Sequence, residues 1–535
     1  MKKILITLLI MGTFFSCEKR YEELNTPKKN PTEVPGETLF TNGMREMFDI
    51  MVNTDVNVNV FRLYAQYWAQ TTYPDESAYN QVTREIPDNI WEDSYKDALK
   101  NMAGGRQKLA DNPDPLLSDG QNANKLAVMD INIAFNYAVL LELFGDIVFD
   151  EALDADNLTP KYDDGKTTYD KIIAMLDASI STLEANAGEG SISSNQDPVY
   201  GGDDTQWLKF ANSLKFRMAL NYFDDSPAKA TTMMTQAYNS GLIMSSSDNC
   251  SITYQSGPPS TNPLYEDLVL SGRKDFIVAN TLVDKLNDLG DMRIFEYATA
   301  PIAFPYHEDA NGDPKDSTVT DGVGRFIIWG DGNIEWRATP FTILGSEADL
   351  EPSLFQGGTY GTANAYAGNS HIGDLMFTPD LKGTIMSSTE VMFMLAEAAA
   401  RGVALGGMTA EDYYNAGIMS SFADWGRSSA EATAYLANPD VAYTTADGGS
   451  GDWKQIIGSQ AWLALYNRGF EGWTTWRRLD FDGLYAPPDM TLADIPTRFL
   501  FPAREATLNG ENLSVAIANV GSDSKTQRLW WDKQN

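Results

Sequence analysis

Residues 388–402 read STEVMFMLAEAAARG, and this stretch decides the fold of the chain. Glu397 stands four residues before Arg401, which is the favourable order for an ion pair on one helix face. Ala396 and the run Ala398–Ala400 are small enough to let a second helix approach closely. The stretch therefore predicts a helix over 389–401 that packs tightly against other helices.

The same helical period extends through most of the chain. Apolar residues recur every three or four positions, which is typical of amphipathic helices. Several segments fall in pairs joined by short loops, as in tetratricopeptide hairpins, although no clean 34-residue repeat is visible. We expect Thr167 or Thr168 to cap the second of these helices. The helices expected are 126–144, 169–183, 207–222, 228–238, 389–401, 411–425 and 455–467.

Residues 249–383 have a different texture, with turn sequences such as Asn311-Gly312-Asp313-Pro314. Only Asp275–Leu289 has a clear helical pattern there, and Arg325–Trp329 could be a strand of a small sheet. Long irregular segments in a compact protein usually carry function. No linker separates this region from its neighbours, so we expect one domain over residues 39–535. The fold class predicted is mostly α, with helical hairpins supporting a loop-rich, ligand-binding half with minor β structure.

The N-terminus has the pattern of an exported protein. Residues 1–16 combine two lysines with a short apolar run, which is typical of a signal peptide. Cys17 follows directly and resembles the lipidated cysteine of bacterial lipoproteins. Residues 17–38 are then a lipidated Cys and an extended tether. We expect no membrane span after Cys17, because the best candidate, 391–408, is interrupted by Glu397 and Arg401.

Charge and cysteine content exclude several classes of function. The net charge of −34 would repel nucleic acid, whose binding needs many Lys and Arg contacts to phosphate. The charge also disfavours adhesion to anionic lipid, so acyl chains such as palmitate must hold the protein at the membrane. Once Cys17 is lipidated, Cys250 has no partner, and no intrachain disulfide is expected.

Catalytic motifs fail on inspection, and we expect neither enzymatic activity nor a cofactor. His307 and His371 are the only histidines, which leaves little for Ser-His-Asp or Cys-His chemistry. Paired carboxylates, as glycosidases use, remain the alternative: a lipid-anchored hydrolase acting on glycans. Asp163-Asp164 and Asp203-Asp204 are examples, but with 74 acidic residues such a pair is usually solvated acid.

One weak calcium pattern stands in the loop-rich region. Asp309, Asn311 and Asp313 have the alternating oxygen spacing of a calcium loop. Pro314 and Thr320 occupy the positions where an EF-hand needs Gly and a bidentate Glu. We therefore expect an acidic turn and no metal.

Aromatic and polar residues outside the helical stripes are the candidate ligand contacts. Sugars stack on Trp or Tyr, while Asn, Asp, Gln or Arg hold their hydroxyls in an oriented cleft. For each aromatic residue the alternative is packing in the core, and Trp91 stands at the start of an expected helix. The candidates are Tyr73, Tyr79, Asn80 and Trp91 in one region and Arg325, Trp329 and Trp336 in another.

Four motifs in order resemble the SusD/RagB nutrient-binding lipoproteins of Bacteroidetes. Residues 388–402 are similar to the family's E-v-x-f-l-x-A-E-A-x-x-r-G helix. Residues 469–478, GFEGWTTWRR, resemble its n-G-x-E-a-W-x-x-x-R-R segment. Residues 495–505 resemble i-P-x-R-x-x-Y-P-x-x-E, and 142–149 the G-D-v-P-y turn, with Val148 in place of Pro. The chain looks closest to the second starch-binding-like group.

The resemblance implies a binding protein rather than an enzyme. It implies four tetratricopeptide-like pairs and a partner, a SusC-like TonB-dependent outer-membrane transporter. Members of the family bind oligosaccharides or peptides, so the ligand of this chain stays open. Glu18, Glu22 and Glu23 resemble the surface-export signal of Bacteroidetes lipoproteins. The location implied is therefore the outer membrane, lipid-anchored and facing the cell exterior.

Overall fold

The computed structural model describes residues 34–299, 317–320, 324–328, 334–338 and 355–533. The longer helices are α2 (Gly36–Val52), α5 (Lys100–Asp111), α6 (Asp119–Phe144), α7 (Gly165–Ala185), α8 (Asp204–Tyr222), α9 (Pro227–Ser240), α11 (Asn280–Leu289), α13 (Ser388–Ala400), α14 (Ala410–Asp424), α15 (Ser429–Leu436), α16 (Trp453–Ala464), α17 (Gly469–Leu479) and α19 (Gly510–Val520). The shorter ones are α3 (Phe61–Tyr64), α4 (Ile86–Glu92), α10 (Pro263–Tyr265), α12 (Ile294–Tyr297) and α18 (Glu505–Leu508).

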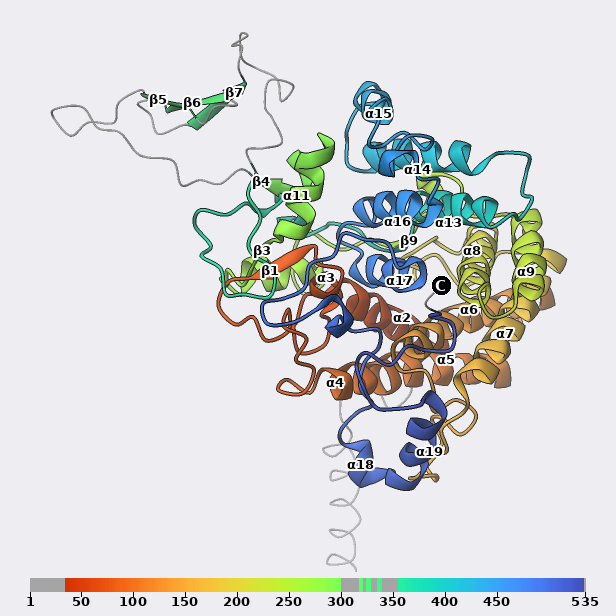
Figure 1. Cartoon of the computed structure of the whole chain (residues 1–535). Helices are drawn as coiled ribbons and strands as arrows, with labels where there is room; N and C mark the ends of the chain where they lie inside the picture. The colour runs from red at the N-terminus through yellow and green to blue at the C-terminus, as the bar shows by residue number, and fades with distance from the viewer. Residues whose placement is uncertain (1–33, 300–316, 321–323, 329–333, 339–354, 534–535) are drawn as a thin grey trace, which may run out of the picture.

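Among the described residues, four helix pairs form the frame of the molecule, and the prediction of a mostly helical fold is confirmed. The pairs are α6–α7, α8–α9, α13–α14 and α16–α17, and each pair packs as a hairpin. The pairs then pack on one another through α7 on α8, α8 on α13 and α13 on α16. Figure 1 shows this stack on one side of the molecule, away from β1, β3 and α11. These are the tetratricopeptide-like hairpins expected from the helical period.

Local capping explains where these helices begin. The side chain of Ser118 accepts the Gln121 amide at the start of α6, and that of Ser387 accepts the Glu390 amide at the start of α13. The predicted cap of α7 is wrong by one turn: Asp164 caps it, with its carboxylate accepting the Thr167 amide. A carboxylate also suits this end of the helix dipole better than a hydroxyl does.

The strands are short, and in the part of the chain that the structure describes they form four small antiparallel sheets. They pair as β1 (Trp68–Gln70) with β3 (Phe276–Val278), β2 (Cys250–Ile252) with β9 (Gly383–Met386), β4 (Ala298–Thr299) with β8 (His371–Ile372), and β5 (Ser317–Thr320) with β6 (Gly324–Ile328) and β7 (Ile334–Ala338). The expected helix over Asp275–Leu289 is wrong in its first turn. Phe276–Val278 pairs with Trp68–Gln70 instead, since a buried apolar run gains more as a strand against a distant partner.

One helix passes the length and composition test for a membrane span, which the sequence reasoning overlooked. In the part of the chain that the structure describes, this is α6, whose apolar window has a mean hydropathy of 1.5. That window is 89% buried inside the protein. Because α7 and α8 cover it, α6 behaves as a core helix of the hairpin stack.

The start of α2 and the surroundings of Cys250 complete the description of the fold. Helix α2 begins at Gly36, three residues before the expected start at residue 39. Gly36 and Gly105 approach backbone to backbone, because a Cβ on Gly36 would lie 2.7 Å from the Gly105 carbonyl oxygen. Cys250 is free and fully buried in β2.

Candidate functional site

A polar pocket opens where the loops around β1 and β3 meet, and we call it the Tyr73 pocket. The strand pairing brings the chain after Gln70 beside the chain before Phe276. The amide of Thr71 donates to the Asp275 carbonyl at 2.9 Å, and the Thr71 hydroxyl donates to the Lys274 carbonyl. The pocket has a volume of about 270 Å³, close to that of small-ligand sites. Its lining includes Asp55, Tyr73, Arg84, Asp267, Arg273 and Asp275.

A buried polar network fixes one wall of the Tyr73 pocket. Gln70 is buried, and its Nε2 donates to the carboxylate of Glu76 at 2.5 Å. Its Oε1 accepts the amide and the hydroxyl of Ser77 at 3.0 and 2.8 Å. Glu76 is fully buried and also pairs with Arg84, which lines the pocket. Because every partner is satisfied, this wall is held rigidly in place.

The opposite wall carries charge close to solvent. The Arg273 Nε donates to Asp275 Oδ2 at 2.5 Å, and Arg273 is exposed. Asp267 accepts the Thr54 amide at 3.1 Å, and burial raises the pKa of Asp267 above its ordinary value. The pocket thus offers hydrogen-bond acceptors and donors on both walls, as hydroxyl recognition requires.

Two tyrosines belong to this edge of the molecule. Tyr73 lines the pocket and is 56% exposed, so more than half of its surface is accessible to a ligand. Lys274, next to Arg273, places its Nζ 4.9 Å from the centroid of the Tyr366 ring. Tyr366 stacks on His371 with ring centroids 3.8 Å apart. Lys274 thus connects the segment that lines the pocket to this stacked pair.

The other predicted contacts in the first region lie elsewhere. Tyr79 is 1% exposed and packs edge-on against Tyr64, so it is a residue of the hydrophobic core. Trp91 is half-buried and packs against the core in an aromatic cluster with Tyr95, Phe144 and Tyr162. Asn80 closes its own turn, since its Oδ1 accepts the amides of residues 82 and 83. Of the four predicted contacts in this region, Tyr73 lines the Tyr73 pocket, and the assignment of Tyr79, Asn80 and Trp91 as ligand contacts stays a prediction.

The second predicted region is described only in its backbone. Arg325 lies in β6 opposite Arg337, and Trp336 lies in β7 opposite Phe326. The expected strand over Arg325–Trp329 is confirmed for residues 325–328, which lie in β6. Trp329 lies outside the described residues, as do Cys17 and the calcium candidates Asp309, Asn311 and Asp313. These five assignments stay predictions.

The acidic pairs named as examples for the hydrolase alternative accept hydrogen bonds from backbone amides. Asp163 accepts the amides of Phe149 and Asp150, both at 2.9 Å, while Asp164 caps α7. Asp203 caps α8, and Asp204 accepts the amides of Gly188 and Gly190. Each carboxylate is therefore occupied in holding a loop or a helix end.

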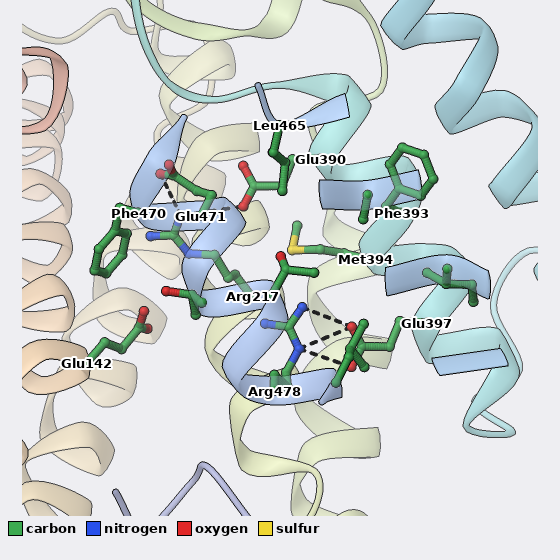
Figure 2. A pocket seen from close by; sticks show the side chains of 15 residues that line it. Glu142, Arg217, Glu390, Phe393, Met394, Glu397, Leu465, Phe470, Glu471 and Arg478 are labelled. Atoms are coloured by element: carbon green, nitrogen blue, oxygen red, sulfur yellow. Dashed lines mark hydrogen bonds and ion pairs between the residues drawn. The ribbon is translucent and has the colours of Figure 1, made fainter. Parts of the chain in front are cut away.

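An interior cavity between α8, α13 and α17 belongs to the scaffold. Its volume is about 20 Å³, which is room for one water molecule and no larger ligand. Figure 2 shows Arg217 between Glu142, Glu390 and Glu471, and it shows the Arg478 guanidinium hydrogen-bonded to the Glu397 carboxylate. Arg478 donates to both carboxylate oxygens of Glu397, and Arg401 donates to the same group at 3.0 Å. The pair expected between Glu397 and Arg401 is present, and Arg478 on α17 shares the same carboxylate on α13.

Sequence reasoning missed most of the Tyr73 pocket. Gln70, Glu76 and Arg84 stand near Tyr73 in sequence but lack any spacing pattern. Asp267, Arg273 and Asp275 are about 200 residues away from Tyr73 in the sequence. The sequence did indicate that residues 249–383 are rich in loops, and loops of this kind often carry binding sites.

Comparison with known proteins agrees with this architecture. No curated protein matches the sequence. A chitin-binding SusD homologue from Flavobacterium johnsoniae has a similar fold, with TM-score 0.70 and 23% identity over 93% of this chain and 99% of that one. A SusD homologue from Bacteroides fragilis gives TM-score 0.72 and 20% identity over 94% and 100%. One from Bacteroides uniformis gives 0.71 and 21% over 93% and 99%.

A family model settles the relationship. The SusD-like_2 model, described as "Starch-binding associating with outer membrane", matches residues 28–313 and 336–502. These two ranges include all four hairpins and the loops of the Tyr73 pocket. The chain therefore belongs to the SusD-like_2 family of outer-membrane-associated binding proteins.

Proposed function

We propose that this protein is a cell-surface lipoprotein that captures an oligomeric glycan in the Tyr73 pocket and passes it to a SusC-like TonB-dependent transporter. The observation that carries the proposal is an exposed tyrosine face at a pocket with fixed polar walls. Tyr73 supplies the stacking surface, and Arg84, Arg273 and Asp267 line the walls with groups that bind hydroxyls. The chitin-binding activity in the name of one structural neighbour supports a glycan over a peptide.

The location proposed follows from the family and the N-terminus together. The family is associated with the outer membrane. Lipid on Cys17 would anchor the chain, and residues 18–35 would link the anchor to α2, which begins at Gly36. The strongly acidic surface would not hold the protein at an anionic membrane, so the anchor has to be covalent.

The proposal treats the protein as a carrier without turnover. It binds the glycan, keeps it intact and releases it to the transporter. The acidic pairs that a hydrolase would use are engaged with backbone amides, which favours binding alone.

Calorimetry of the mature chain against a panel of chito-, malto- and β-gluco-hexaoses and peptides tests the proposal. We expect at least one hexaose to bind and to be recovered uncleaved. Tyr73→Ala should weaken that binding, while Tyr485→Ala, an exposed tyrosine outside the pocket lining, should leave it unchanged. Equal binding by Tyr73→Ala and the parent protein would contradict the assignment of the pocket.

A further inference from the structure

A second cavity lies at the C-terminal end of α17, and we call it the Trp476 cavity. It is bounded by α17, the segment after it, the turn around Leu492 and the chain near Arg528. Its volume is about 500 Å³, within the range of ligand sites and larger than the Tyr73 pocket. The two cavities share no lining residue.

Trp476 is the aromatic wall of this cavity. Its helix neighbours Trp473 and Arg477 are fully buried, and the Arg477 guanidinium lies 3.8 Å from the Trp473 ring centroid. Trp476 is only half-buried, and among the described residues its ring has no aromatic or cationic partner and its indole N–H no acceptor. The motif that carries the scaffold requires Trp473 and the two arginines but leaves position 476 open. Trp476 packs against the hydrophobic core with part of its surface, and it also lines the cavity.

The polar wall is fixed in advance. Asp480 ends α17 with a positive φ of 52°, and its amide donates to the Trp476 carbonyl at 2.8 Å. This conformation turns the Asp480 carboxylate toward Arg528, whose Nη2 donates to it at 2.5 Å. Arg528 is held from the other side by Asp532. A guanidinium fixed at both ends loses little freedom when a ligand binds.

The rim of the cavity is held just as firmly. Gln455 on α16 bonds both backbone groups of Asp482, accepting its amide at 2.7 Å and donating to its carbonyl at 3.1 Å. The Asp482 side chain is exposed and makes no hydrogen bond to the described residues. Its carboxylate is thus presented at the mouth of the cavity as a free acceptor.

We propose that the Trp476 cavity is a second binding site for a sugar oligomer, with the Trp476 indole as the stacking surface and Asp480, Asp482 and Arg528 as partners of the hydroxyls. A flat apolar ring beside paired charges suits a neutral, polyhydroxylated ligand. An anionic ligand would meet the net charge of −34. The proposal rests on the proposed function only in taking a glycan as the ligand class.

Calorimetry and tryptophan fluorescence on the mature chain, with the same chito-, malto- and β-gluco-hexaoses, test the second site. We expect two sites per chain. Trp476→Ala should weaken one of them about tenfold or more and remove the fluorescence change, while Trp476→Phe should retain part of the affinity. Tyr73→Ala should leave the Trp476 site intact. Circular dichroism and melting temperature check that each variant is folded.

The outcomes separate the two proposals. If Tyr73→Ala abolishes all binding and Trp476→Ala changes nothing, the second site is wrong and the Tyr73 pocket stands. If the parent protein binds no hexaose, both are wrong. If Trp476→Ala does not fold, crystals of the parent protein soaked with a bound hexaose decide: a sugar ring over the Trp476 indole supports the site, and density at the Tyr73 pocket alone overturns it.

Discussion

Replacing Glu397 by Gln should destabilise the protein strongly, because this carboxylate neutralises two buried arginines. Glu397 is 1% exposed. It accepts from Arg478 at 3.1, 3.1 and 2.9 Å and from Arg401 at 3.0 Å. Burial alone would raise the pKa of Glu397, but the charges of Arg478 and Arg401 hold it below its ordinary value. The group is therefore ionised in the folded protein at neutral pH.

The size of the loss in unfolding free energy follows from the partners that Arg401 and Arg478 keep when Glu397 is replaced. Arg401 retains Asp224 at 2.7 Å, so its charge stays paired. Arg478 keeps two neutral acceptors, the Asn221 side-chain oxygen at 3.2 Å and the amide oxygen of the new Gln, but no carboxylate among the described residues pairs with it. Removing one partner of a buried pair costs about 3–5 kcal/mol of unfolding free energy. We expect Glu397→Gln to lie in that range.

Urea denaturation followed by circular dichroism measures this change. Lys96→Gln is the matched control, because it breaks the Lys96–Glu92 pair, whose side chains are 61% and 42% exposed. The control should cost less than about 1 kcal/mol. The contribution of Glu397 should be complete above pH 4.5 and should be lost as the pH falls through its lowered folded-state pKa. A cost for Glu397→Gln as small as that of the control would refute the reasoning.

Four further predictions follow from single sites. Tyr73→Ala should weaken glycan binding by roughly 1–3 kcal/mol in calorimetry with little change in stability, since the ring is 56% exposed. Tyr79→Ala should do the opposite and lower the unfolding free energy by about 3–5 kcal/mol, because the ring is buried against Tyr64; a loss of binding without destabilisation would contradict the core assignment. Cys17→Ala should release the protein from the membrane fraction, and unchanged anchoring would rule out lipidation at this residue. Burial raises the pKa of Asp532 to about 7 against the opposing effect of Arg528. The folded state therefore binds this proton more tightly than the unfolded chain does, and the free energy of unfolding should fall as the pH rises from about 4 to about 7. Asp532→Asn should flatten this pH dependence, and an unchanged slope would refute the assignment of the slope to Asp532.

The helices could be predicted because their signal is local. The stripe in 126–144 needs only neighbours three and four residues away, and α6 covers it in full. The error at Phe276–Val278 shows the limit of that signal. Strand pairing with Trp68–Gln70 depends on residues about 200 positions away, which no local period contains.

In the candidate site, too, the local sequence does not distinguish exposed residues from buried ones. Tyr73 and Tyr79 stand six positions apart in one polar stretch, yet one is 56% exposed and the other 1%. Tyr79 has a positive φ of 63°, and its hydroxyl accepts from the buried Gln66 at 3.1 Å. Neither the turn nor the partner can be inferred from composition, so exposure had to come from the tertiary structure.

The sequence by itself determined the helical class, the family and the scaffold motif. Spacing on one helix is enough to show that Glu397 and Arg401 form a pair. Only the tertiary structure decided that Arg478, from a helix about 80 residues later, shares that carboxylate and that loops from residues 54–57, 70–84 and 267–276 enclose one pocket. The physical reason is that helical periodicity is set by neighbouring residues. A buried charge pair or a pocket is set by which distant surfaces pack together.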